Sequence, residues 1–142
     1  METTHLPDEI KPVMENGVPA DVVSCSAGGI PNTTIISQVY YVDREHVALS
    51  FQFFNKTVKN VRENPNACVL LNDLKGRATW ILQARYEHSE TEGPVFDRMD
   101  MQIEAIASAT GMTGIFKLKA ADIYRVHTVR KVAFRAESTD QN

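Results

Sequence analysis

The feature that most constrains the fold is an alternation of apolar and polar residues between Ala78 and Ser89, broken only by Ile81. The apolar face is made of Ala78, Trp80, Leu82, Ala84 and Tyr86. A period of two is the repeat of a β-strand, whose successive side chains point to opposite faces of the sheet. One apolar and one polar face are typical of a half-solvated strand in an antiparallel sheet.

Other stretches rich in β-branched and aromatic residues predict further strands. They are Ala20–Ser26, Asn32–Val42, Val47–Phe51, Ala67–Leu71, Ile115–Lys119 and Ile123–Val129. Neither face of Asn32–Val42 is cleanly apolar, so we expect it to be covered on both sides. Ala120–Asp122 is expected to connect the last two strands. Helices are expected before Gly17 and over Val95–Thr110. The pattern predicts a mainly β (α+β) chain, with about six strands in a small antiparallel barrel and short flanking helices.

Size and charge limit the class of protein. The chain has 142 residues, which predicts a single domain over residues 1–136 and a disordered polar tail over residues 137–142. A formal net charge of −3 argues against a nucleic-acid partner or an anionic membrane surface. The sequence shows neither a signal peptide nor an apolar run of transmembrane length. These features predict a cytoplasmic protein.

Cysteine and histidine spacing predicts no metal site. Cys25 and Cys68 stand far apart in sequence and are expected to be small buried apolar residues. His127 stands alone, so a metal or heme role for it is disfavoured. Trp80 is expected in the core or in a subunit interface, and Glu104 is expected to face solvent.

A strand, a polar turn and a helix start follow one another in Ser50–Pro65. Asn55 is a good N-cap residue, and Lys56, Thr57 and Lys59 fall in the first turns of the helix. The free amides and the dipole of a helix start favour an anion, and these side chains add further donors. The alternative is an ordinary solvated face. The stretch therefore predicts either a phosphate site or a plain surface helix.

Three paired stretches resemble one known family. They are Gly28–Asn32 with Ser37–Asp43, Ser50–Thr57 with Asn64–Pro65, and Ala107–Met112 with Ala121–Val126. Their order and spacing are similar to those of the pyridoxamine 5'-phosphate oxidase-like, FMN-binding split-barrel family, above all its flavin-nucleotide-binding branch. The likeness extends from Leu6 to Val129.

The resemblance implies a six-stranded split β-barrel that forms a homodimer, with two FMN sites at the subunit interface. Asn55, Lys56 and Thr57 occupy the place of a Ser-Arg-Lys motif that holds the FMN phosphate. Thr79 lies near the place of a glutamine that reaches the flavin ring. The implied cofactor-binding residues are Ile36, Ser37, Gln38, Val39, Ser50, Phe51, Asn55, Lys56, Thr57 and Thr79. No catalytic residue is implied.

The implied function is an FMN-dependent oxidoreductase that acts on a small-molecule substrate or electron donor. Trp80 is the one tryptophan, and the family's tryptophan- and arginine-containing final segment has no counterpart, so pyridoxamine-phosphate oxidase activity is not expected. Two alternatives stay open: a non-catalytic flavin-binding or sensory module, and a barrel that binds heme or a deazaflavin. The sequence shows no acid, base or nucleophile constellation that would separate them.

Overall fold

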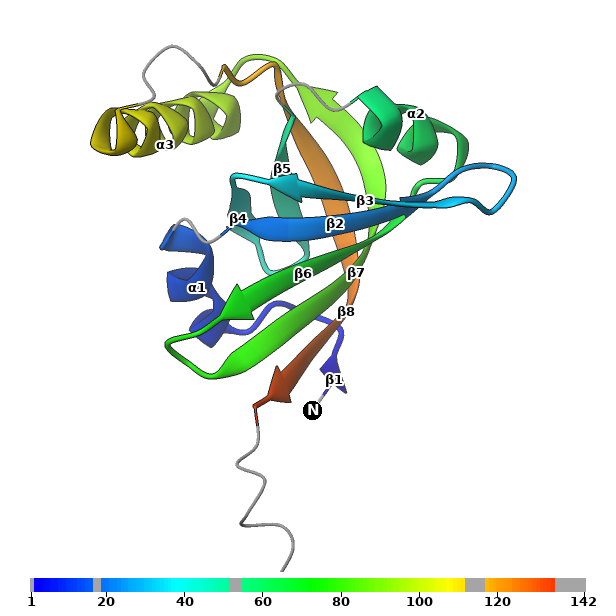
Figure 1. Cartoon of the computed structure of the whole chain (residues 1–142), viewed down its shortest axis with the longest axis horizontal. Coiled ribbons are helices and arrows are strands. Elements are labelled where there is room, and N and C mark those ends of the chain that lie inside the picture. The colour runs from blue at the N-terminus through cyan, green and yellow to red at the C-terminus, as the bar shows by residue number, and fades with distance from the viewer. Residues whose placement is uncertain (1, 17–18, 52–54, 112–116, 135–142) are drawn as a thin grey trace, which may run out of the picture.

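The computed structural model describes residues 2–16, 19–51, 55–111 and 117–134, about half of them in strands (Figure 1). In chain order the elements are β1 (Glu2–Thr3), the 3-10 helix η1 (Asp8–Ile10), α1 (Lys11–Glu15), β2 (Ala20–Cys25), β3 (Pro31–Ile36), β4 (Val39–Asp43), β5 (His46–Phe51), α2 (Asn55–Glu63), β6 (Asn66–Asp73), β7 (Ala78–Glu90), α3 (Pro94–Thr110) and β8 (Ala120–Ala133). The predicted tail over residues 137–142 lies outside the described residues.

The strands form one antiparallel sheet in the order β3-β2-β6-β7-β8-β5-β4, with β1 paired to β8. The predicted mainly β, antiparallel fold is confirmed. The described residues form eight strands where about six were expected. One reason is β1, two residues long, which is too short to produce a sequence pattern.

The predicted strand Asn32–Val42 is two strands, β3 and β4, separated by Ser37 and Gln38. These strands lie at opposite ends of the hydrogen-bonded order, so the chain itself joins the two ends of the sheet. The amide of Ser50 donates to the carbonyl of Gln38 at this junction, at 3.2 Å. The barrel is therefore split. Ser37 and Gln38 connect β3 to β4 along the chain, but these two strands are not joined by hydrogen-bonded pairing.

The expected cover on both faces is wrong for β3 within one chain. Its residues alternate between exposed and partly buried, and Ile35 is 63% exposed. Covering the exposed face of β3 would take a second molecule.

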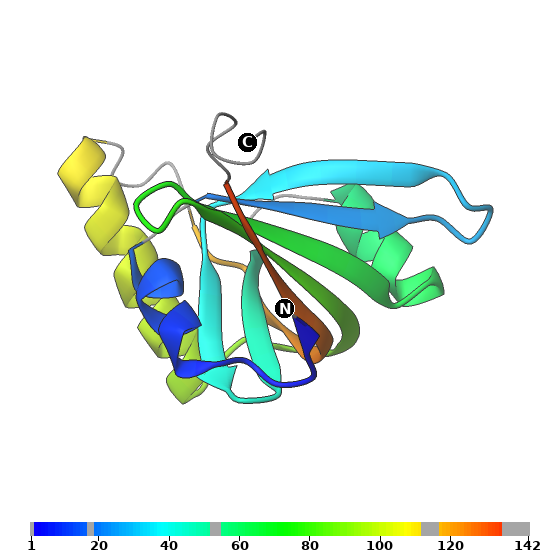
Figure 2. The same cartoon turned by 90° about the horizontal axis from the view of Figure 1, so that it is seen from below.

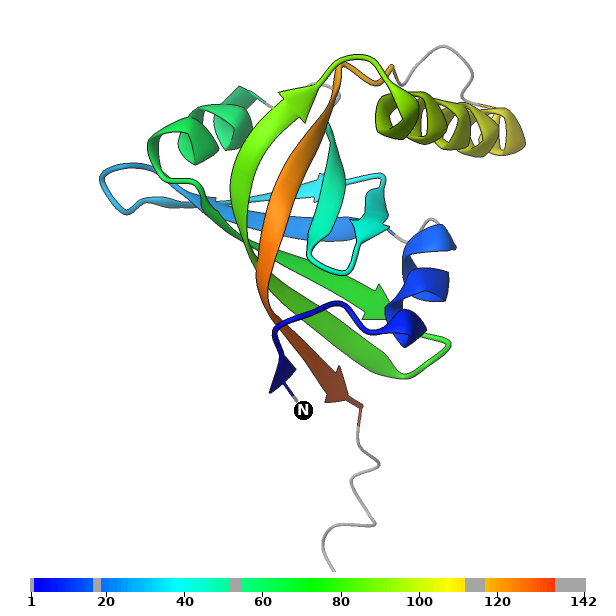
Figure 3. The same cartoon turned by 180° about the vertical axis from the view of Figure 1, so that it is seen from behind.

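The two longest strands, β7 and β8, pair along most of their length and bend at two register shifts (Figure 3). Ala78, Trp80, Leu82 and Ala84 are buried, as the alternation predicts.

The prediction for Ala120–Asp122 is wrong, because these residues are the start of β8 and not a connection. They pair with the ends of β5 and β7, and this long-range pairing outweighs the low strand preference of alanine and aspartate. The expected strand Ile115–Lys119 is not found over residues 117–119, and its first two residues lie outside the described part.

The helices cover separate parts of the barrel. α2 and α3 lie at opposite ends of the molecule (Figure 2). Leu6, Ile10 and Met14, from the N-terminal segment with η1 and α1, are buried in the main core with Trp80. Met99 and Ile103 of α3 pack in a second cluster against β5 and β8. α3 ends at Gly111, whose φ of 73° is a conformation that glycine adopts without strain. Among the described residues, no helix is long and apolar enough to cross a membrane.

Candidate functional site

The start of α2 lies directly after β5 in the chain, and Asn55 is its first residue. Lys56 and Lys59 are exposed, and Thr57 is partly buried. The first turn contains no acidic residue. Because the first amides of a helix have no partner within it, this end presents donors and a favourable dipole to an anion. The side chain of Asn55, the predicted N-cap, lies outside the described residues.

A second group of charges lies farther along α2. Lys59 and Arg62, the latter in the last turn of the helix, line an open hollow with Phe51, and the carboxylate of Glu63 lines it as well. The Nζ atom of Lys119 lies 5.8 Å from the centre of the Phe51 ring, and the amide of Lys119 donates to the Phe51 carbonyl. The sequence pattern assigned no role to Lys119, because it lies far along the chain and reaches Phe51 through the fold.

The structure brings four of the predicted site residues together around one small pocket. Its lining is Val22, Thr34, Ile36, Leu49, Ser50, Phe51, Thr57, Val58, Asp122 and Tyr124. Thr57 accepts a hydrogen bond from Asn32 Nδ2 at 3.4 Å, which ties α2 to β3. The pocket volume is about 20 Å³. A cavity needs at least about 10–15 Å³ to hold one water, so this pocket is far too small for an aromatic ring system, which would have to lie outside it.

The barrel junction between β3 and β4 contains Ser37, Gln38 and Val39. It lies close to this pocket, because Ser50 lines the pocket and also contacts Ser37. The hydroxyl oxygens of Ser37 and Ser50 are 3.5 Å apart. Gln38 is 2% exposed; its amide nitrogen donates to Gln102 of α3, and its Oε1 has no partner among the described residues. Val39 is buried in the main core. A buried acceptor without a donor is costly, so Gln38 Oε1 marks a place where a ligand donor would be stabilised.

Thr79 is not brought to this site within one chain. It lies near the start of β7 and donates to Asn72 at 2.9 Å. Ser50 pairs with Ala121, which pairs with Glu90 at the other end of β7. Eleven residues of strand separate Thr79 from that end, which is about 36 Å at about 3.3 Å per residue. Thr79 can contribute only if a second chain brings it there.

Sequence reasoning missed the two ionisable residues that line the pocket, Asp122 and Tyr124. Asp122 is 7% exposed, and its Oδ1 accepts a hydrogen bond from Ser89 Oγ at 2.6 Å. Burial raises the pKa of the Asp122 carboxyl above its usual value. Burial and the nearby Asp122 also raise the pKa of the Tyr124 phenol. The available signal was the aspartate directly before the predicted strand Ile123–Val129, but Ala120–Asp122 was predicted to be a connection.

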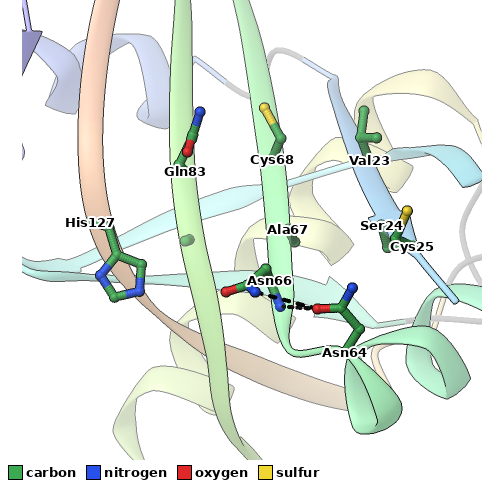
Figure 4. Close-up of a pocket in the computed structure, with 10 residues that line it drawn as sticks. Val23, Ser24, Cys25, Asn64, Asn66, Ala67, Cys68, Gln83 and His127 are labelled. Carbon is green, nitrogen blue, oxygen red and sulfur yellow. Dashed lines mark hydrogen bonds between the residues drawn. The ribbon is translucent and has the colours of Figure 1, made fainter. Parts of the chain in front are cut away.

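A separate and wider pocket lies on a face of the sheet formed by β2, β6, β7 and β8 (Figure 4). Cys68 and Gln83 are opposite each other on β6 and β7, and His127 lies beyond Gln83 on β8. Both cysteines were predicted to be buried, but Cys25 and Cys68 are free thiols that are only partly buried. Burial raises the pKa of the Cys68 thiol, which keeps it protonated and unreactive at neutral pH. Within the described ranges no three metal-ligating side chains meet, and Glu104 is exposed as predicted.

The sequence profile of the pyridoxamine 5'-phosphate oxidase family matches residues 6–127, which is most of the chain. The chain belongs to this family. The resemblance inferred from the three sequence stretches is thereby confirmed. Among curated proteins, none matches the chain.

Solved structures show the same split-barrel fold at low sequence identity. An FMN-binding protein from Syntrophomonas wolfei superposes with a TM-score of 0.71 at 16% identity, over 90% of this chain and 87% of that one. HupZ from Group A Streptococcus gives 0.67 at 19% identity, over 92% and 99%. HutZ, a heme storage protein from Vibrio cholerae, gives 0.54 at 14% identity, over 92% of each chain. At such identities the likeness defines the fold of this family member and leaves its ligand open.

Proposed function

We propose that this member of the family is an FMN-binding flavoprotein and acts as an oxidoreductase on a small molecule. The observation that carries the proposal is the start of α2. Lys56, Thr57 and Lys59 stand there with free helix amides, beside a pocket lined by Ser50 and Phe51. Anions bind at such helix starts because the amides and the dipole both favour negative charge.

The residues present fit a phosphorylated flavin. Lys56 and Thr57 would hold the phosphate, and the ring system would lie outside the pocket, near Ile36 and Phe51. Gln38 Oε1, a buried acceptor without a donor, matches a ring N–H. When bound, FMN supplies the transfer of hydride or electrons, and the protein supplies binding and orientation.

The proposal includes a homodimer with the sites between subunits. A pocket of about 20 Å³ cannot enclose a flavin ring, and β3 exposes Ile35 on the face opposite Thr34 and Ile36, which line the pocket. Because β3 is the last strand in the order of the sheet, a second chain packed along it would cover both the ring and Ile35. Thr79 remains a proposed contact across such an interface.

Pyridoxamine-phosphate oxidase activity is not part of the proposal. Trp80 is 1% exposed and packs in the main core, so the one tryptophan of the chain is not available to a substrate. We expect no pyridoxal phosphate from pyridoxamine phosphate above the rate with free FMN.

Stopped-flow reduction by NADH and by NADPH tests the proposal. The protein is loaded with FMN, and loss of the oxidised flavin absorbance is followed. Reduction faster than that of free FMN is the expected result. Tight FMN binding without accelerated reduction would instead indicate the non-catalytic or sensory alternative. A protein that binds heme or a deazaflavin in preference to FMN would contradict the proposal.

A further inference from the structure

A buried carboxyl, Asp122, forms part of the wall of the small pocket beside the start of α2. Ser89 donates to its Oδ1 at 2.6 Å, and the Tyr86 hydroxyl lies 2.6 Å from Ser89 Oγ. Because the Ser89 proton points to the carboxylate, Tyr86 donates to Ser89. The two hydroxyls hold Asp122 in one orientation from the β7 side.

Few charges face Asp122. Arg62 of α2 lowers its pKa, while the buried phenol of Tyr124 stands beside it on β8 and Tyr86 faces it from β7. The pocket residues of β2, β3 and β5 are uncharged. Burial is the largest effect and raises the pKa of Asp122, so the folded protein holds this carboxylate at a cost. A costly buried carboxylate beside a pocket is a candidate for a functional role.

The size of the pocket limits what it can hold. Its volume of about 20 Å³ accommodates one group the size of a water molecule. Asp122 and the hydroxyls of Ser50 and Thr57 give it polar sides, and the other side chains are mainly apolar. A hydroxyl group has the right size and donates the proton that a carboxylate accepts.

The pocket also has a defined position between two parts of the proposed ligand. Thr57 belongs to the helix start assigned to the phosphate, and Ile36 lies on the strand assigned to the ring. In FMN a polyol chain connects these two parts. Its hydroxyls are therefore the ligand groups that pass the mouth of the pocket.

We propose that the pocket is a hydroxyl subsite, in which Asp122 accepts a hydrogen bond from the polyol chain of the flavin nucleotide. The inference rests on the proposed FMN function and assigns a specificity role to Asp122. It predicts recognition of the chain independently of both the ring and the phosphate.

Titration of three ligands into the wild type and Asp122→Asn tests the subsite. FMN has ring, polyol and phosphate; riboflavin lacks the phosphate; lumiflavin has a methyl group in place of the polyol. We expect Asp122→Asn to weaken FMN and riboflavin by the same factor, about tenfold for a lost hydrogen bond to a charged group, and to leave lumiflavin unchanged. Asp97→Asn, an exposed aspartate on α3, is the matched control and should change none of the three.

A second variant covers the case in which Asp122→Asn fails to fold. Ser89→Ala keeps the carboxyl and removes the group that orients it, so a smaller loss with the same ligand pattern is expected. Equal losses for all three ligands, or none, would overturn the subsite while leaving FMN binding intact. A wild type that binds no flavin would overturn the proposed function and the subsite together.

The pH dependence supplies an independent measurement. Only the ionised carboxyl accepts strongly, and its raised pKa places ionisation above the usual carboxyl range. The ratio of riboflavin to lumiflavin affinity should therefore rise with pH in the wild type and stay constant in Asp122→Asn. Riboflavin is used because the phosphate of FMN itself titrates. A ratio that does not change with pH in the wild type would contradict the assignment.

Discussion

At the scale of single residues, the chemistry of this protein depends on polar side chains that the fold buries. The side chains of Asp122 and Gln38 are both buried. Burial makes the charged form of the Asp122 carboxyl costly, and Gln38 Oε1 has no hydrogen-bond partner among the described residues. The sequence predicted Gln38 through family resemblance but missed Asp122. An aspartate is usually depleted in strands, so its place between Ala121 and Ile123 favoured a connection over a strand. Pairing with β5 and β7, which local sequence does not encode, decided the outcome.

Asp122 should destabilise the ligand-free protein at neutral pH. Its pKa is raised in the folded state, so the folded protein binds more protons than the unfolded chain between the usual and the raised value. Stability from this group is complete below the usual pKa and is lost as pH rises through the raised one. Asp122→Asn should therefore increase the free energy of unfolding at pH 7, with a smaller gain in acid. Urea denaturation at a series of pH values measures it; a variant less stable than the wild type at pH 7 would refute the explanation.

At the scale of elements, α2 is positioned by contacts that sequence could predict only in part. Val58 and Val61 are three residues apart, a spacing that predicts a shared helix face, and Val61 is buried. The helix ends at Glu63, just before Pro65, because a proline disfavours helical conformation in the residue that precedes it. The hydrogen bond from Asn60 Nδ2 to Ser24 Oγ, at 3.1 Å between two buried side chains, had no sequence signal because 36 residues separate the partners. The helix start was thus predictable, and its attachment to β2 was not.

This attachment should matter for stability. Asn60→Ala removes the donor and leaves Ser24 buried with one partner fewer, at a cost of about 1–3 kcal/mol. The double variant with Ser24→Ala should cost less than the sum of the two single variants, because it removes both polar groups and leaves neither unsatisfied. Denaturation of the two single variants and the double variant gives the coupling energy. Additive losses would mean that this hydrogen bond does not hold α2 in place.

At the scale of the whole molecule, the alternating strand β7 predicted the antiparallel sheet, but the closure of the barrel was not readable from sequence. No pattern showed that Ser37 and Gln38 interrupt what was expected to be one strand. They do so because β3 pairs only with β2 and β4 only with β5. The closure leaves the outer face of β3, opposite the pocket-lining Thr34 and Ile36, exposed at Ile35, and the proposed dimer follows from that exposed face.

Sedimentation of the flavin-loaded protein tests the dimer. We expect a homodimer whose interface exceeds about 2,000 Å² in total, as in obligate dimers. Ile35→Glu, on the exposed face of β3, should shift the protein to monomer and weaken FMN binding. Leu74→Glu replaces another exposed apolar residue, in the turn after β6, and should leave the dimer intact. A wild-type monomer at micromolar concentration that still holds flavin would be inconsistent with a site between subunits.

The central claim, that the start of α2 binds the phosphate of FMN, is tested most directly by calorimetric titration of FMN and riboflavin into the wild type, Lys56→Ala and Lys75→Ala. Lys75 is an exposed lysine in the turn between β6 and β7 and serves as the control. Lys56→Ala should weaken FMN by about tenfold to a hundredfold, the loss of one charged hydrogen bond, and change riboflavin little. Lys75→Ala should change neither. Equal losses for FMN and riboflavin in Lys56→Ala would show that the phosphate lies elsewhere.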